Sequence, residues 1–78
     1  MINNSFSLNP EIFQEISNKA IANKRISWGF IERICSTFDD VLEIVIYSIS
    51  VGALFTGIPS EKTEKFLISH NINLRNLQ

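Results

Sequence analysis

The chain has 78 residues, a formal net charge of −1 and a single cysteine, Cys35. A chain this short makes one domain and buries only about 60% of the surface that its unfolded form exposes, so its stability is marginal. One cysteine cannot form an intramolecular disulfide, and the near-neutral charge excludes a whole-molecule field that attracts nucleic acid. Apolar residues are 45% of the chain, so a dense core or a subunit interface has to supply the stability.

The first ten residues, MINNSFSLNP, lack the basic and apolar segments of a secretory signal. A lone cysteine also fits a reducing compartment, which favours a cytoplasmic location. We expect residues 1–8 to be a flexible lead and residues 9–78 to form a single helical domain. The abundance of Asn, Ser and Ile indicates an AT-rich gene, which is compatible with a bacterial or phage origin.

The first two predicted helices follow clear start signals. Asn9 is a suitable N-cap, Pro10 suits the first helical position, and Glu11 suits the positive end of the helix. Apolar residues then recur at helical spacing: Ile12, Phe13, Ile16, Ala20 and Ile21. A second short helix is predicted after Ser27, a candidate cap. Its apolar residues are Trp28, Phe30, Ile31, Ile34 and Cys35. The pattern leaves open whether residues 10–35 form one helix or two.

The longest apolar stretch follows two overlapping capping boxes, residues 36–39 and 37–40, in each of which an acid stands three residues after a hydroxyl. No charged residue occurs from residue 44 to residue 60. A membrane span needs about 20 apolar residues. This stretch is shorter, contains several Ser, Thr and Gly residues and has no flanking basic cluster, so a membrane partner is not expected.

The same stretch can be interpreted as a strand or as a helix. As a strand, its alternate residues share one apolar face: Val45, Tyr47, Ile49, Val51, Ala53 and Phe55. A strand needs others to pair with, and no other segment has a strand pattern, so helix is favoured for residues 43–58 while strand stays open. The predicted helix spans about residues 38–56. It is apolar nearly all round, as in helices at the centre of a bundle or at a subunit interface.

A last helix is predicted to begin after Ser60, another candidate cap, and to end near Asn71. Glu61 and Glu64 are in its first turn. Its inner face is formed by Phe66, Leu67 and His70. Residues 72–78 are predicted to form a short closing helix or a docking tail. The fold class is therefore all-α: a small bundle of three to five short helices around a central apolar helix.

No group of residues indicates catalysis or a cofactor. Asp39 and Asp40 are adjacent, so on a helix their side chains point about 100° apart and do not converge. No Ser or Cys beside His70 is evident as a nucleophile from the sequence. Cys35 lies within an apolar pattern that is typical of a small core residue, and its separation from His70 matches no metal-binding motif. We therefore expect a protein that is not an enzyme and that uses no cofactor or metal.

Residues 20–34, AIANKRISWGFIERI, can be aligned with a helix-turn-helix, which makes DNA binding the alternative function. In that arrangement Lys24, Arg25 and Arg33 are the candidate nucleic-acid contacts. The pattern departs from the motif because Lys24 replaces an apolar residue and Arg25 a glycine, and because Trp28 would be exposed on the reading face. With a net charge of −1, nucleic acid is the less favoured partner.

The favoured function is protein–protein interaction. A short chain with much apolar surface and no catalytic residues favours a homodimer or a protein partner. The candidate interface residues are Trp28, Phe30, Val45, Ile49 and Phe55. Trp is enriched at interaction hot spots, although a core role for Trp28 and Phe30 is the stronger alternative in so small a domain. We predict a small regulatory or adaptor protein that masks, recruits or inhibits a partner and associates with itself.

Two segments resemble known families. NKRISWGFIERICSTFDD, residues 23–40, resembles the middle of the small enterobacterial biofilm and acid-stress regulators, which implies a dimeric helical adaptor. The match rests on Asn23, Lys24, Ile26, Ile31, Thr37 and Asp39. The glycine-containing loop expected before it is missing, and residues 57–78 have no counterpart. IPSEKTEKF, residues 58–66, resembles the late part of an acyl carrier protein, but the Asp-Ser-Leu that would carry the phosphopantetheine arm is absent.

Overall fold

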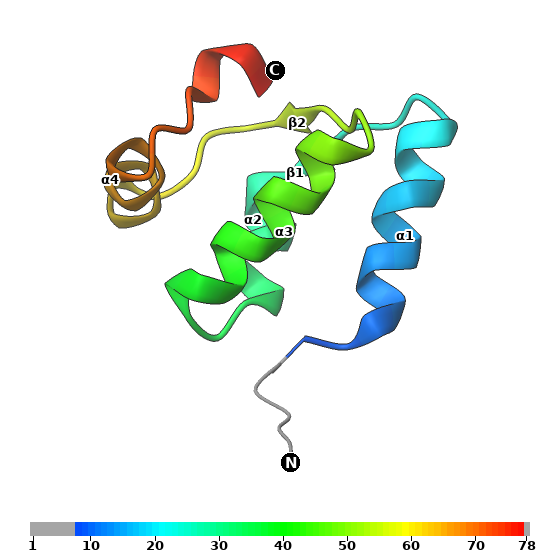
Figure 1. The fold of residues 1–78 in the computed structure, drawn as a ribbon, viewed down its shortest axis with the longest axis horizontal. Helices are drawn as coiled ribbons and strands as arrows, with labels where there is room; N and C mark the ends of the chain where they lie inside the picture. The colour runs from blue at the N-terminus through cyan, green and yellow to red at the C-terminus, as the bar shows by residue number, and fades with distance from the viewer. Residues whose placement is uncertain (1–7, 78) are drawn as a thin grey trace.

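The computed structural model describes residues 8–77 and shows a mostly helical domain, which confirms the predicted fold class. Its elements in chain order are α1 (Pro10–Ile21), β1 (Ile26–Ser27), α2 (Trp28–Ile34), α3 (Phe38–Ser50), β2 (Phe55–Thr56), α4 (Glu61–Ser69) and the 3-10 helix η1 (Leu74–Leu77). Helix α3 lies in the middle, with α1 on one side, α4 on the other and α2 behind it (Figure 1). Of the predicted lead, residues 1–7 lie outside the described residues, and Leu8 is buried against the core.

Within residues 8–77, each of the four α-helices begins at a side-chain cap that the sequence predicted. The capping oxygens of Asn9, Ser27, Thr37 and Ser60 accept the backbone N–H of Glu11, Phe30, Asp40 and Thr63 at 2.9, 3.0, 3.1 and 3.5 Å, respectively. Of the two overlapping capping boxes, the second supplies the cap of α3. Such caps satisfy donors that the first turn leaves unpaired, and each stabilises its helix by about 1 kcal/mol.

Helices α1, α3 and α4 end in the same way, at a residue in the left-handed conformation. After α3 this residue is Gly52, with a φ of +79°, and the N–H of Ala53 donates to the carbonyl of Ser48 at 2.9 Å. Asn23 and Asn71 take the equivalent position after α1 and α4, with φ of +60° and +65°. Gly adopts this conformation without steric cost and Asn tolerates it, so these residues terminate the helices.

The charge-free stretch therefore contains both a helix and a strand. Helix α3 ends at Ser50, not near residue 56 as predicted, and the chain then forms β2. Strand β2 pairs in parallel with β1, with Ile26 opposite Phe55. The prediction that no other segment is a strand is wrong, because a strand of two residues is too short to show an alternating pattern. Since β1 lies between them, α1 and α2 are two separate helices.

The core lies where α3 packs against α1, α2 and α4, and the strand pair contributes Ile26 and Phe55 to it. Its largest fully buried apolar side chains are Trp28, Phe55, Ile16, Ile26, Ile31, Ile44, Leu67 and Val45. The rings of Trp28 and Phe55 stack with centroids 4.7 Å apart, because the pairing of β1 with β2 brings the two residues together. Helix α3 buries Val41, Ile44, Val45 and Ser48. A neighbouring side of the helix, with Ile46 and Ile49, faces outward.

Candidate interaction surface

The outward side of α3 is apolar and largely uncovered. Ile46 is 54% exposed and Ile49 is 44% exposed, and half-buried Leu42 lies one turn before Ile46. The spacing of residues 42, 46 and 49 places all three on one stripe of the helix. We call these three residues the α3 stripe. Adjacent exposed apolar side chains of this kind are typical of a surface that contacts another molecule.

Helix α1 supplies a second wall beside the α3 stripe. The ring of Phe13 meets the ring of Tyr47 edge-on, with centroids 5.1 Å apart, and the hydroxyls of Ser17 and Tyr47 are hydrogen-bonded. These contacts hold α1 against α3 beside a groove of about 500 Å³. The lining of this α1–α3 groove consists of Phe13, Asp39, Leu42, Glu43, Ile46, Tyr47 and Ser50. An apolar groove with a few polar groups at its margin suits side chains of a partner.

The five predicted interface residues do not form one surface. Trp28, Val45 and Phe55 are at most 1% exposed and belong to the core, so in this fold they present nothing to a partner. Phe30 is half-buried on α2. Ile49 is the member of the five that lies in the α3 stripe. On α3, the exposed side is therefore not the one that carries Val45 but the neighbouring one that carries Ile46 and Ile49.

The residues that the sequence interpretation missed are Phe13, Leu42, Ile46 and Tyr47. The sequence held a signal for Leu42 and Ile46, because residues 42, 46 and 49 are apolar and are spaced by four and then three residues, as on one face of a helix. Nearly every face of α3 is apolar, however, so periodicity could not tell its outer side from its inner side. The sequence did not show that α1 forms the other wall of the groove, because this follows from the tertiary contact between Phe13 and Tyr47.

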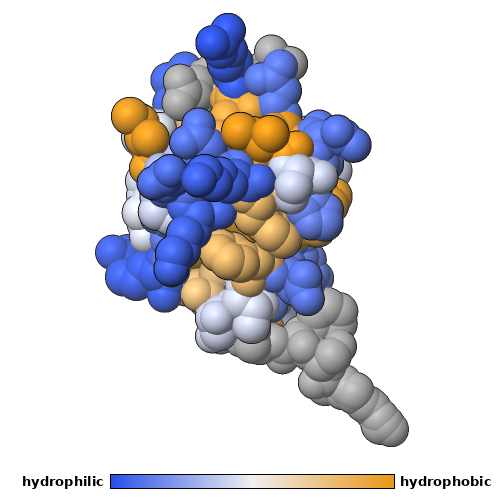
Figure 2. Space-filling model, turned by 90° about the vertical axis from the view of Figure 1, so that its left-hand side faces the viewer, coloured by the Kyte–Doolittle hydropathy of each residue, from blue (hydrophilic) through white to orange (hydrophobic). Residues whose placement is uncertain are grey.

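A second apolar area lies over α4, on the face shown in Figure 2. The ring of Phe38, at the start of α3, stacks on Phe66 of α4 with centroids 5.0 Å apart, and the ring of His70 lies 4.5 Å from that of Phe66. Apolar atoms occupy the middle of this face and hydrophilic side chains surround them (Figure 2). The three rings pack on one another, so this cluster joins α4 to α3.

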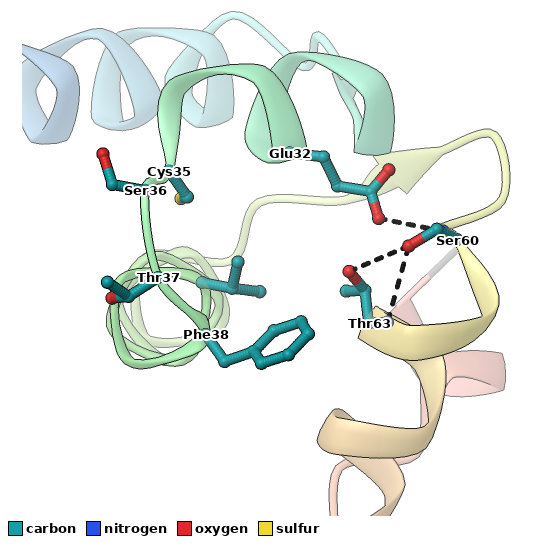
Figure 3. A pocket seen from close by; sticks show the side chains of 8 residues that line it. Glu32, Cys35, Ser36, Thr37, Phe38, Ser60 and Thr63 are labelled. Carbon is teal, nitrogen blue, oxygen red and sulfur yellow. Dashed lines mark hydrogen bonds between the residues drawn. The ribbon is translucent and has the colours of Figure 1, made fainter.

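A pocket of about 360 Å³ lies between α2, the start of α3 and the start of α4 (Figure 3). In it, Glu32 of α2 accepts a hydrogen bond from the backbone N–H of Ser60 at 2.9 Å, and the Ser60 hydroxyl donates to the Thr63 hydroxyl at 3.2 Å. In a capping box the third helical residue accepts the N–H of the cap residue. Thr63 occupies that position in α4, and Glu32 accepts the N–H in its place. Glu32 therefore fastens α4 to α2.

Two titratable groups of this pocket have shifted pKa values. Burial alone would raise the pKa of Glu32, but hydrogen bonds from Thr63 and Ser60 outweigh it and lower that pKa below its ordinary value. Burial, together with the charge of Asp40, raises the pKa of Cys35 to about 11. The Cys35 thiol therefore stays protonated at neutral pH and is a poor nucleophile.

Comparisons of the chain with protein-family models, with curated proteins and with solved structures found no match. Among the helices within residues 8–77, none combines the length and the apolar character needed to cross a membrane. Over the same residues, no three side chains of His, Cys, Asp or Glu come together as a group that could hold a metal ion.

The arrangement of residues 20–34 differs from a helix-turn-helix. Helices α1 and α2 are joined by residues 22–27, which include β1, whereas the motif joins its helices by a turn of about three to four residues. Trp28 is buried in the core instead of lying on a reading face. The predicted nucleic-acid contacts, all of them exposed, are Lys24, Arg25 and Arg33. They do not sit on a helix pair of the required geometry.

The link between Glu32 and α4 predicts a pH-dependent stability. The pKa of Glu32 is lower in the folded than in the unfolded protein. Its contribution to the unfolding free energy is therefore fully present above the unfolded-state pKa, and it is lost as the pH falls through the folded-state pKa. We expect Glu32→Gln to cost about 0.5–1 kcal/mol of unfolding free energy near neutral pH, because a neutral acceptor replaces a charged one. The difference from wild type should shrink as the pH falls to about 3, below the ordinary pKa of Glu.

Urea unfolding followed by circular dichroism at a series of pH values measures this difference. Glu64→Gln, which removes an exposed carboxylate from α4, the helix that Glu32 contacts, is the control. A Glu32→Gln penalty that is the same at every pH, or that equals the effect of Glu64→Gln, would contradict the proposed role of Glu32.

Proposed function

We propose that this protein is a small adaptor or regulatory protein that acts by protein–protein interaction and associates with itself. The observation that supports this most is the α3 stripe, in which Ile46 and Ile49 remain 54% and 44% exposed next to the α1–α3 groove. The occupant that we propose is a second copy of the chain. We further propose a cytoplasmic location, in keeping with the unpaired Cys35.

The energetic reason is the small size of the domain. Full burial of an isoleucine side chain contributes about 1.5–3 kcal/mol, which is a large term for a domain of marginal stability. In a two-fold dimer each residue of the stripe is buried twice, once in each copy. Association through the stripe therefore stabilises both the fold and the complex. Masking or uncovering this surface is the mechanism by which the protein would regulate a partner.

Replacing both exposed isoleucines tests the proposal. We expect wild type to run as a dimer at high concentration and to dissociate on dilution, and the Ile46→Glu/Ile49→Glu variant to remain a monomer throughout. Size exclusion with light scattering over a concentration series measures the mass. The variant should stay a monomer because its two new carboxylates per copy would have to lose their hydration at the interface.

The chain offers a matched control for this experiment. Ile68 of α4 is 57% exposed and lines neither the α1–α3 groove nor the α3 stripe. Ile68→Glu should therefore associate as wild type does, whereas the single variant Ile46→Glu, with the same change in net charge, should associate more weakly. Circular dichroism shows whether each variant is folded. A wild type that is monomeric at every concentration, or two variants that lose association equally, would overturn the proposal.

A further inference from the structure

Helices α1 and α3 run in the same direction along the proposed surface (Figure 1). Phe13, in the first half of α1, is in contact with Tyr47, in the last turn of α3. Beyond them, Ala20 near the end of α1 shares a small cavity with Gly52 and Leu54, which follow α3. The amino-terminal ends of the two helices therefore lie at one end of the surface, and their carboxyl-terminal ends lie at the other.

The charged side chains divide along this direction. The first turn of α1 and the start of α3 carry three acids that are exposed or half-buried, which are Glu11, Asp39 and Glu43, and Asp40 beside them is buried. The last turn of α1 and the segment after it carry bases, which are Lys19, Lys24 and Arg25. Two of the bases, Lys24 and Arg25, line the cavity that Gly52 and Leu54 border. The surface therefore has an acidic end and a basic end.

Helix dipoles reduce this separation of charge without cancelling it. The two amino-terminal helix ends add about half a positive charge each, and the carboxyl-terminal ends about half a negative charge each. At one end, the three acids together with the two positive helix ends leave a net of about two negative charges. At the other end, the three bases together with the two negative helix ends leave a net of about two positive charges. Two copies placed in the same direction would therefore bring like charges together, and copies in opposite directions would bring opposite charges together.

We propose that a second copy docks on the α3 stripe in the antiparallel direction, so that the acidic end of each copy faces the basic end of the other. This orientation rests on the proposed function, since it requires that the stripe is a contact between copies. It is also a two-fold arrangement, in which every contact occurs twice and the assembly closes at two subunits. The interface would pair Glu43 of one copy with the Lys24 region of its partner.

Charge reversal tests the orientation. Glu43→Lys and Lys24→Glu should each raise the dimer Kd at low salt about tenfold, because each single reversal creates two repulsive contacts in a two-fold dimer. The Glu43→Lys/Lys24→Glu variant keeps the net charge of wild type and should return the Kd to within about threefold of it. High salt should reduce all of these differences, because the charges are near the surface. Sedimentation equilibrium measures the Kd.

Two exposed residues of α4 serve as controls with the same change in net charge. Glu64→Lys matches Glu43→Lys, and Lys62→Glu matches Lys24→Glu. The antiparallel orientation would be overturned if the controls raised the dimer Kd as much as Glu43→Lys and Lys24→Glu do. It would also be overturned if the double variant dimerised as weakly as the single variants. In that case a dimer that Ile46→Glu/Ile49→Glu dissociates would still support the proposed function. A monomeric wild type would overturn both.

Discussion

Replacement of Trp28 by alanine is expected to leave much of the protein unfolded at room temperature. The Trp28 side chain is 1% exposed and stacks on Phe55 between β1, α2 and β2. Truncation of a buried Trp or Phe to Ala costs about 3–5 kcal/mol. A domain of this length has a total unfolding free energy of about 4–12 kcal/mol, so the loss removes a large part of it. Urea unfolding followed by circular dichroism measures the change without depending on the lost indole.

Phe30→Ala is the matched comparison for Trp28→Ala, since Phe30 is half-buried on the same helix. We expect it to cost less than half as much, because the lost transfer energy scales with the area that the ring buries. If Trp28→Ala unfolded at the same urea concentration as Phe30→Ala, Trp28 would not be a core residue. A role as a surface anchor would then be open again.

Val45→Asp is expected to prevent folding, whereas Ile49→Asp is expected to leave the fold intact. Val45 is fully buried on the inner side of α3, so its replacement would place a carboxylate among apolar side chains. Burial of a charge without a partner costs several kcal/mol and exceeds what a small domain can lose. Ile49, one turn further along α3, is 44% exposed, so a carboxylate at this position keeps its contact with water.

Thermal unfolding of the two variants under the same conditions separates these expectations. Val45→Asp should show no cooperative transition and Ile49→Asp a transition near that of wild type. Val45→Ala serves as a milder change at the buried position and should lower the transition temperature without abolishing it. A cooperative, wild-type-like transition of Val45→Asp would show that the inner side of α3 is not the core.

Local signals in the sequence were enough to place the helix starts. Asn9, Ser27, Thr37 and Ser60 each cap a helix through a hydrogen bond to a residue two or three positions further on. A cap acts within one turn, so the residues that form it are neighbours in the sequence. The same holds for the end of α4 at Asn71, which the sequence also indicated.

The strand pair was not predictable in the same way. Strands β1 and β2 have two residues each, and their pairing joins Ile26 to Phe55 across α2 and α3. A pairing at this distance along the chain leaves no pattern within either segment. The end of α3 was missed for a related reason, since the apolar residues after Gly52 continue the composition of the helix although they belong to a turn and a strand. The capping by Glu32 from another helix is equally non-local.

What the sequence by itself determined is a small helical domain with capped helices and a central apolar helix. What only the tertiary structure decided is which side of that helix remains exposed. Residues 41, 44, 45 and 48 and residues 42, 46 and 49 lie on different sides of α3, and both sets are largely apolar. The first set is buried where α1, α2 and α4 pack against α3, whereas Ile46 and Ile49 remain 54% and 44% exposed. Hydrophobicity determines that a residue favours burial, but only the packing of other elements determines which residues are buried.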